Sequence, residues 1–216
     1  MSSLDTPQTL TDVIRSFRRK SGKEAFRYRT QFRTFSWTYP EAFRNALKLC
    51  QFLRNQDVDP GQPVMVWAPN SPAWVWVYLG CILNRSPLVP IDMGSHPNFV
   101  ENVRQETDAQ LLFTSRVNDS LNEPIPVHQI EDFVFPEDHA LSEASPHRPD
   151  DADEVAEIIY TSGTTGTPKG TILTHRNLVA NQNSLIEYVA DVVDFPYHFL
   201  SLLPLSHAFE QTVGFR

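Results

Sequence analysis

The segment Tyr160–Gly170 reads YTSGTTGTPKG and lies between EVAEIIY (Glu154–Tyr160) and GTILTH (Gly170–His175). Both flanks are rich in β-branched and apolar residues and are typical of strands. Between them are three glycines, five serine or threonine residues and one lysine: Gly163, Gly166, Gly170, Thr161, Ser162, Thr164, Thr165, Thr167 and Lys169. Glycines let backbone N–H groups approach an anion, hydroxyls donate hydrogen bonds to phosphate oxygens, and lysine supplies a mobile charge. The segment therefore predicts a phosphate-binding loop, with a Gly/Thr-rich turn of no function as the alternative.

The familiar loop of the P-loop NTPases is a different pattern. It requires a glycine followed at once by lysine and a hydroxyl residue, and then a helix. Here Lys169 stands between Pro168 and Gly170, and a strand is expected to follow. Both the spacing and the context exclude that class of nucleotide site.

Outside this segment, strands and helices alternate at the spacing of βαβ units. Strands are expected over residues 63–68, 88–91, 111–114 and 199–203. One helix is expected to begin at the Thr38–Glu41 capping box, and three more are expected over 71–84, 97–108 and 177–190. Such alternation favours an α/β fold with a mainly parallel sheet and helices on both faces. The acidic, proline-containing stretch 135–153 is typical of a surface connection.

Composition limits the classes of binding partner and the cellular compartment that the protein can be expected to have. The 216 residues carry 18 basic and 26 acidic side chains, a net charge of −8, and no basic stripe interleaved with aromatic residues, which argues against a nucleic-acid partner. The longest apolar run, 73–83, is too short for a transmembrane segment. Cys50 and Cys81 fall in apolar helical patterns and are expected to be buried free thiols, which favours a reducing, cytoplasmic location.

A cluster of basic residues lies near the N-terminus. It consists of Arg15, Arg18, Arg19, Lys20, Lys23, Arg27 and Arg29. A solvated helix end explains the cluster most simply, and peripheral contact with a membrane surface is the alternative.

The segment 160–170 resembles, almost letter for letter, the phosphate-binding signature of the adenylate-forming (AMP-binding) superfamily, which includes acyl-CoA synthetases, peptide-synthetase adenylation domains and luciferases. The resemblance continues in SWTYPEAFRNALKLCQFLR (Ser36–Arg54), in Asp57–Asp92 and in Asp150–Leu178. LPLSHAFEQTVGF (Leu203–Phe215) is similar to the family's carboxylate-pocket motif, and its His207–Glu210 spelling favours the long-chain fatty acyl-CoA synthetases.

This resemblance implies a fold and a domain organisation. Members of the family are more than twice as long, with a large N-terminal domain and a small mobile C-terminal one. Residues 1–216 would form the front part of the large domain, with mainly parallel sheets and flanking helices. The C-terminal part of that domain and the small domain would be absent, so the chain alone is expected to be inactive. Residues 84–87 depart from the family's usual small residues, which puts only local packing in doubt.

The resemblance also implies an activity: ATP-dependent activation of a carboxylic acid, with a fatty acid favoured, to an acyl-adenylate, followed by thioester formation with coenzyme A. The residues that would hold the ATP phosphates are Thr161, Ser162, Gly163, Thr164, Thr165, Gly166, Thr167 and Lys169. Thr164 would also bind Mg²⁺. The catalytic residues would be Lys169, which offsets the charge of departing pyrophosphate, and His207, near the substrate carboxylate.

Three alternatives stay open. The chain could belong to the adenylation domain of a peptide synthetase, or it could be a non-catalytic module that binds a nucleotide or a partner. For His207 the alternative is a histidine packed in the core. His175 is expected to cap the helix after the second strand and to stay clear of ligand.

Overall fold

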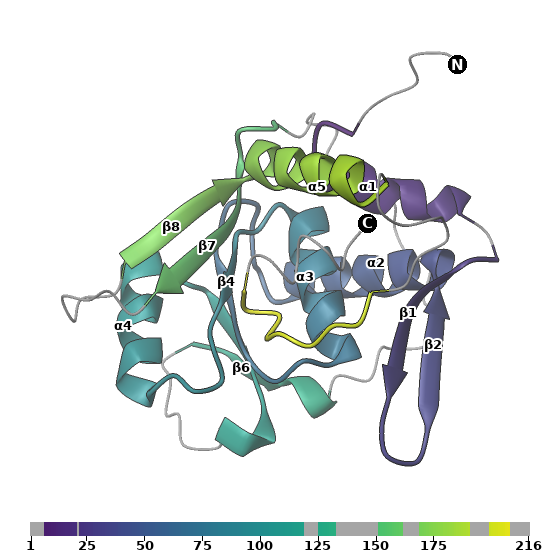
Figure 1. The fold of residues 1–216 in the computed structure, drawn as a ribbon. Coiled ribbons are helices and arrows are strands. Elements are labelled where there is room, and N and C mark those ends of the chain that lie inside the picture. Colours follow the sequence, from purple (N-terminus) through teal and green to yellow (C-terminus); the bar gives the residue numbers. More distant parts are fainter. Residues whose placement is uncertain are drawn as a thin grey trace.

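A six-stranded sheet forms the centre of the protein (Figure 1). The computed structural model describes residues 7–20, 22–118, 125–132, 151–161, 169–190 and 199–207. The sheet has the order β6-β5-β3-β4-β7-β8, in which the strands are Val127–Gln129, Leu111–Thr114, Val64–Trp67, Leu88–Pro90, Val155–Thr161 and Lys169–Thr174. Neighbours from β6 to β7 pair in parallel, and β8 pairs antiparallel with β7. The expected mainly parallel sheet is confirmed.

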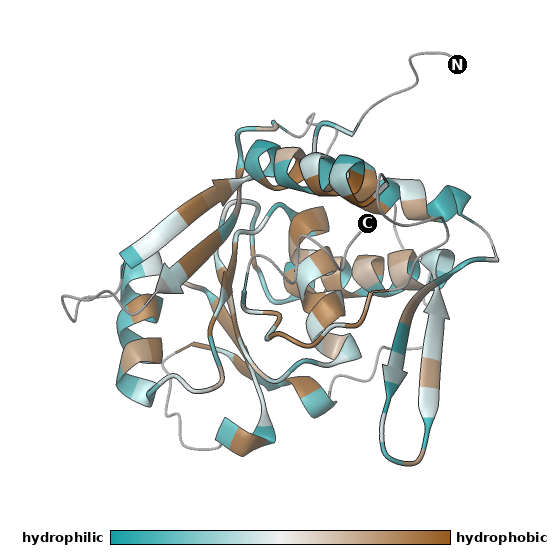
Figure 2. Cartoon of the chain, in the orientation of Figure 1, coloured by the Kyte–Doolittle hydropathy of each residue, from teal (hydrophilic) through white to brown (hydrophobic). Residues whose placement is uncertain are grey.

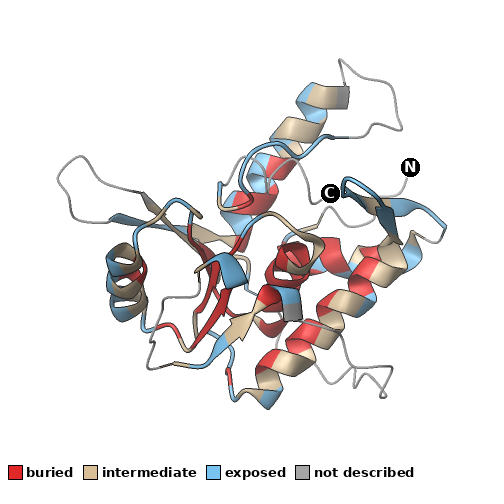
Figure 3. Cartoon of the chain, turned by 90° about the horizontal axis from the view of Figure 1, so that it is seen from below, coloured by how far each residue is buried: buried red, intermediate tan, exposed pale blue. Residues whose placement is uncertain are grey.

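Helices cover both faces of this sheet and create two cores. The larger core joins one face to α1 (Leu10–Ser16), α2 (Tyr39–Asn55), α3 (Pro72–Asn84) and α5 (His175–Ala190), and the smaller joins the other face to α4 (Pro97–Thr107). Strand side chains alternate between faces. Accordingly, Val64 and Val66 of β3 enter the larger core, while Met65 and Trp67 enter the smaller one. Figure 3 shows these central strands and the core side of the helices as buried.

Helix α3 is the most deeply buried helix and is apolar nearly all round (Figure 2). The Ser71 hydroxyl caps it by accepting from the backbone N–H of Trp74 at 3.2 Å. Helix α2 packs so closely against it that a methyl group at Gly80 would lie 2.6 Å from the Cβ of Leu49. This contact requires glycine, because real Cβ atoms do not approach other heavy atoms so closely.

Helix α2 begins at the predicted capping box. The backbone N–H and the hydroxyl of Thr38 both donate to the Glu41 carboxylate at 2.7 Å, and the Glu41 N–H donates back to the Thr38 hydroxyl at 3.4 Å. This reciprocal arrangement satisfies backbone donors that a helix start leaves unpaired.

The departure at residues 84–87 has a local structural explanation. Arg85 adopts a left-handed conformation (φ 62°) that ends α3, and its guanidinium pairs with Glu154 just before β7. Asn84, which is buried, donates to the Val58 carbonyl and to the Ser86 hydroxyl, both at 3.0 Å. The end of α3 is therefore bonded to the segment that precedes β3, through Val58, and to the segment that precedes β7, through Glu154.

Two sequence expectations can be compared directly with the structure, and one element was not expected. Cys50 and Cys81 are buried free thiols, as predicted. Residues 199–203, expected as a strand, form none, and the apolar side chains of Phe199, Leu200 and Leu202 are exposed. A separate antiparallel hairpin of β1 (Glu24–Arg29) and β2 (Thr34–Thr38) was not anticipated. Most of the expected connection 135–153 lies outside the described residues.

Candidate active site

Strands β7 and β8 hold the two ends of the phosphate-binding signature. They pair from Val155↔Thr174 to Thr161↔Lys169, so the signature starts at the end of one strand and finishes at the start of the next. The strands predicted on both flanks are therefore confirmed. Six predicted phosphate-binding residues lie outside the described residues: Ser162, Gly163, Thr164, Thr165, Gly166 and Thr167. Of the rest, Thr161 ends β7 and Lys169 begins β8 as an exposed residue.

Tyr160 and Gly170 form a close contact at the base of this segment. A Cβ at Gly170 would lie 2.9 Å from the Tyr160 Cζ, so the ring lies over the glycine. Burial and the nearby Glu106 carboxylate of α4 raise the pKa of Tyr160. Gly170 thus has a packing role that composition alone does not reveal.

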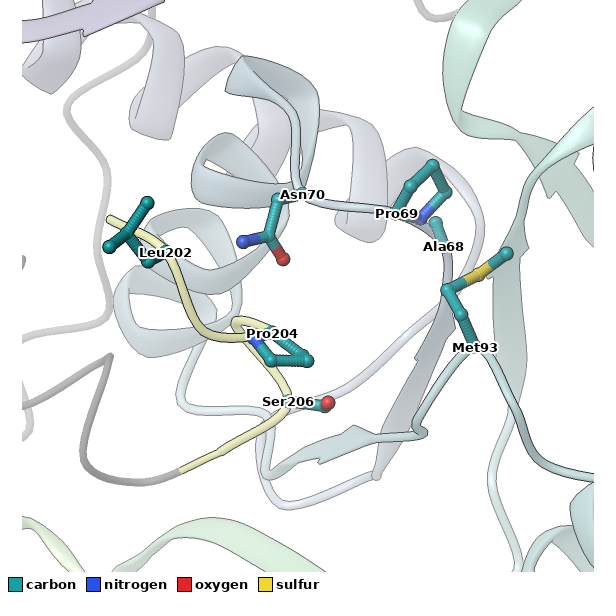
Figure 4. A pocket seen from close by; sticks show the side chains of 7 residues that line it. All are labelled: Ala68, Pro69, Asn70, Met93, Leu202, Pro204 and Ser206. Carbon is teal, nitrogen blue, oxygen red and sulfur yellow. The ribbon is translucent and has the colours of Figure 1, made fainter. Parts of the chain in front are cut away.

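A cavity of about 240 Å³ lies beyond the carboxyl ends of β3 and β4 (Figure 4). Its lining residues follow β3, follow β4 or belong to the segment 199–207: Ala68, Pro69, Asn70, Met93, Leu202, Pro204 and Ser206. The surface is mainly apolar, with Asn70 and Ser206 as its polar side chains. Open parallel sheets bind ligands at this edge.

Parallel pairing places the phosphate signature at the same edge. Strands β3, β4 and β7 run in the same direction, with Leu88 of β4 opposite Glu157 of β7. Their carboxyl ends therefore meet one edge of the sheet, where β7 leads into the signature and β3 and β4 lead into the cavity. The signature and the cavity are thus brought to one edge of the sheet.

Asn70 fixes the chain segment that forms the far wall of the cavity. Its Nδ2 donates to the carbonyl of Leu203, and its Oδ1 accepts from the backbone N–H of Leu205, both at 2.7 Å. These bonds join positions more than 130 residues apart. Sequence reasoning missed Asn70, although a polar residue directly after a buried strand was a usable signal.

His207 is at the end of the same segment and is exposed. Its backbone N–H donates to the Pro204 carbonyl at 3.0 Å, and its Nε2 lies 3.9 Å from Oδ2 of Asp92, the second residue after β4. Because 61% of the His207 side chain is exposed, it is not the packed core histidine of the alternative interpretation. Asp92 was not predicted as a site residue. Phe209 and Glu210 lie outside the described residues.

His175, by contrast, is structural. It begins α5, is buried, and its Nδ1 accepts from the backbone N–H of Leu10 at 3.3 Å. The imidazole therefore joins α5 to α1, which lie side by side in Figure 1. The predicted capping role of His175 is wrong, because the Thr174 hydroxyl caps α5 by accepting from the backbone N–H of Asn177 at 3.3 Å.

The residues present fit a phosphate group better than they fit a metal alone. Lys169 is an exposed cation next to five hydroxyl residues, the donor set that phosphate oxygens need. Among the residues that the structure describes, no group of three or more His, Cys, Asp or Glu side chains could hold a metal ion.

Fold and site together define an α/β protein in which a segment rich in glycine and hydroxyl residues and an apolar cavity share the carboxyl edge of a mainly parallel sheet. The chain belongs to the AMP-binding enzyme family, whose sequence model matches residues 13–215. This confirms the resemblance to adenylate-forming enzymes.

Two curated relatives illustrate the range of the family. Long chain acyl-CoA synthetase 7, peroxisomal, of Arabidopsis thaliana is 30% identical over 208 residues, which cover 82% of this chain and 29% of that protein. A probable non-canonical nonribosomal peptide synthetase, CymA, of Salinispora arenicola is 31% identical over 157 residues, covering 71% of this chain and 2% of that protein. The chain spans no more than about a third of the length of these relatives.

Solved structures show the same fold. The N-terminal subdomain of Klebsiella oxytoca NpsA, in complex with 3-hydroxybenzoyl-AMSN, superposes with a TM-score of 0.77 at 19% identity, covering 96% of this chain and 50% of that one. The mainly parallel sheet with flanking helices is thus the arrangement of adenylate-forming N-terminal domains. In the described part of the chain, no helix combines the length and apolar character needed to cross a bilayer.

Proposed function

We propose that residues 1–216 are the front part of the N-terminal domain of an ATP-dependent acid–thiol ligase, with a fatty acid as substrate and coenzyme A as thiol acceptor. The observation that carries this proposal is the sharing of one sheet edge by the hydroxyl-rich segment after β7 and the apolar cavity after β3 and β4. Activation of a fatty acid by ATP needs both a phosphate site and an apolar acid site.

The reaction has two steps. A carboxylate oxygen of the acid attacks the α-phosphorus of ATP, and the bond to pyrophosphate breaks. The thiol sulfur then attacks the acyl carbon, and AMP leaves with the oxygen. Such displacements depend on positioning and on neutralising charge, so hydrogen-bond donors and cations matter more than a protein nucleophile.

In this scheme the residues Thr161, Ser162, Thr164, Thr165, Thr167 and Lys169 bind the phosphates by side chain, and Gly163 and Gly166 do so by backbone. Lys169, at the start of β8, offsets charge on the departing pyrophosphate. Thr164 contributes a hydroxyl to Mg²⁺, which neutralises phosphate charge when bound. His207, whose Nε2 lies 3.9 Å from Oδ2 of Asp92, orients the acid carboxylate.

The choice of a fatty acid is supported by the match to the Arabidopsis synthetase over 82% of this chain and by the mainly apolar cavity. A peptide-synthetase adenylation domain is the second candidate, supported by the match to the Salinispora protein. We place the enzyme in the cytoplasm, since both cysteines are free.

The experiment measures acid-dependent exchange of pyrophosphate into ATP, in the 216-residue chain and in the longest natural protein that contains it. We expect no exchange by the chain alone and exchange with fatty acids in the longer protein. Exchange driven by amino acids would favour the peptide-synthetase alternative, and no exchange with any acid would contradict the proposal.

Two substitutions and a control locate the site in the longer protein. We expect Lys169→Ala and Thr164→Ala to lower the exchange rate by about a hundredfold, because each removes a group that binds developing phosphate charge. Arg176→Ala is the matched control, since it removes an exposed cation from the next element, where it pairs with Asp153. Equal rates for Lys169→Ala and Arg176→Ala would show the phosphate assignment to be wrong.

A further inference from the structure

Charge is distributed very unevenly along this acidic chain. Residues 13–40 hold eight of its 18 basic residues and one of its 26 acidic residues, Glu24. The local net charge is therefore +7, although the whole chain carries −8. An asymmetry of this size indicates an anionic partner for the N-terminal region.

The β1–β2 hairpin, which projects from the body of the protein (Figure 1), carries three of these basic residues: Arg27, Arg29 and Arg33. Its base is anchored, because Phe26 and Trp37 each contact the buried Trp76 edge-on with ring centroids 5.7 Å apart. Every residue from 27 to 36 is exposed, and Figure 3 shows the same region as exposed surface. The outer half is thus a projecting element on a fixed base.

Register sorts the side chains of this outer half. Tyr28 pairs with Phe35, while Arg27 pairs with Ser36 and Arg29 with Thr34. Because successive side chains alternate across a strand, aromatic rings occupy one face and arginines the other. Among the described residues, neither Arg29 nor Arg33 has an acidic partner, whereas Arg27 pairs with Glu24 at 2.8 Å.

Phe32 is at the tip between these arginines. The turn is closed by hydrogen bonds from Thr30 N–H to the Arg33 carbonyl at 2.8 Å and from Arg33 N–H to the Thr30 hydroxyl at 3.0 Å. The Phe32 side chain is 90% exposed, the largest value among the exposed large hydrophobic residues of the described chain. An ordered turn that presents one phenyl ring to solvent between two cations is amphipathic at its tip.

We propose that this hairpin, residues 27–36, docks the protein onto an anionic lipid surface. Basic side chains are attracted to anionic headgroups, and an aromatic ring is stable at the level where headgroups meet acyl chains. The proposal deepens the proposed function and rests on it in one respect: a ligase for fatty acids would meet its substrate at a membrane.

Nucleic acid and a second copy of the chain fit this surface less well. Bases need open aromatic faces, but Phe35 is stacked on Trp37 with centroids 6.3 Å apart, and Phe35 and Tyr28 are only 42% and 39% exposed. A symmetric pair of hairpins would bring like charges together.

Vesicle flotation tests the proposal with the full 216-residue chain. The probes are vesicles of phosphatidylcholine alone and of phosphatidylcholine with 30% phosphatidylserine, at low and high salt. We expect binding to the anionic vesicles only, and loss of binding as salt rises. Arg29→Gln with Arg33→Gln should weaken binding about 25-fold, at about fivefold per cation, and Phe32→Ser about tenfold.

Val117→Ser is the matched control, because Val117 is 79% exposed and lies far along the chain from the hairpin. It should bind like the unmodified chain, and circular dichroism should show all variants folded. Absence of binding, equal binding to neutral vesicles, unchanged binding by the hairpin variants, or tighter binding to single-stranded RNA would each overturn the proposal. Flotation does not measure adenylation, so its failure leaves the proposed ligase activity intact, and an inactive ligase leaves vesicle binding intact.

Discussion

Asn70 shows how one side chain can hold a site together. It connects the end of β3 to residues 203–205 through two hydrogen bonds of 2.7 Å, and these residues lead directly to His207. We expect Asn70→Ala to release this segment and to speed hydrogen exchange at the Leu205 amide by about fivefold, because a hydrogen bond of this kind contributes about 1 kcal/mol.

Asn70→Asp is the control for that prediction. The carboxylate keeps an acceptor for the Leu205 N–H but loses the donor to the Leu203 carbonyl. Protection of the Leu205 amide should therefore survive in Asn70→Asp. Equal exchange rates for Asn70→Ala and the unmodified chain would mean that this amide is protected by something else.

Glu41 gives a prediction about pH at the start of α2. Hydrogen bonds from the Thr38 backbone N–H and hydroxyl lower the pKa of Glu41 below its usual value near 4.5. A carboxyl whose pKa is lower in the folded state stabilises the fold above its unfolded pKa, and this stabilisation is lost as pH falls through the folded pKa.

Glu41→Gln, which cannot ionise, isolates this effect. Urea unfolding should show the unmodified chain more stable than Glu41→Gln at pH 7, by less than about 1 kcal/mol because the carboxyl is near solvent. The difference should disappear below the lowered pKa. A difference that is the same at pH 7 and pH 3 would exclude ionisation of Glu41 as its source.

At the residue scale, contacts between residues close in the sequence could be predicted, and contacts between distant residues could not. The capping box of Thr38 and Glu41 could be predicted because both partners lie within four residues. Asn70 could not, since its partners at 203 and 205 become neighbours only after folding. The same holds for Gly170, where a side chain is excluded by the Tyr160 ring on the paired strand β7.

At the scale of elements, the close contact between α2 and α3 gives a direct test of how the helices pack. Replacing a helical glycine by alanine ordinarily favours the helix by about 1 kcal/mol. At Gly80, however, the new methyl would lie 2.6 Å from both the Cβ and the Cδ2 of Leu49. Overpacking costs about 1–3 kcal/mol, and the Leu49 Cβ cannot move without its helix. We therefore expect Gly80→Ala to lower the free energy of unfolding.

A double-mutant cycle with Leu49→Ala checks the cause. Leu49→Ala removes the Cγ and Cδ2 contacts but keeps the Cβ, so Gly80→Ala should cost less in that background. Additive effects in urea unfolding would show that the contact does not limit packing. A stabilising Gly80→Ala would contradict the helix packing described above.

Elements with one strong pattern were predictable. Helix α3 was expected over residues 71–84, and it covers Pro72–Asn84. Residues 199–203 were expected as a strand on apolar content, but their side chains are exposed and the segment is held by Asn70 instead. The β1–β2 hairpin was missed, although its aromatic residues alternate with polar ones at strand spacing, a signal that could have found it.

At the scale of the whole molecule, the parallel direction of three strands brings the parts of the candidate site together. The order β3-β4-β7, all parallel, brings the phosphate signature and the apolar cavity to one edge. The signature could be recognised in the sequence by its composition, its expected flanking strands and its resemblance to the family's motif. The cavity could not, because its walls come from three segments that are distant in the sequence.

The most direct test of the phosphate-site assignment is to measure binding of MgATP to the 216-residue chain by phosphorus NMR. We predict that the β- and γ-phosphate resonances shift on binding, that Lys169→Ala weakens affinity about tenfold, and that Arg176→Ala leaves it unchanged. A charged hydrogen bond to phosphate accounts for a loss of that size. Absence of binding, or equal affinity of Lys169→Ala and the unmodified chain, would contradict the assignment of residues 160–170 as the phosphate site.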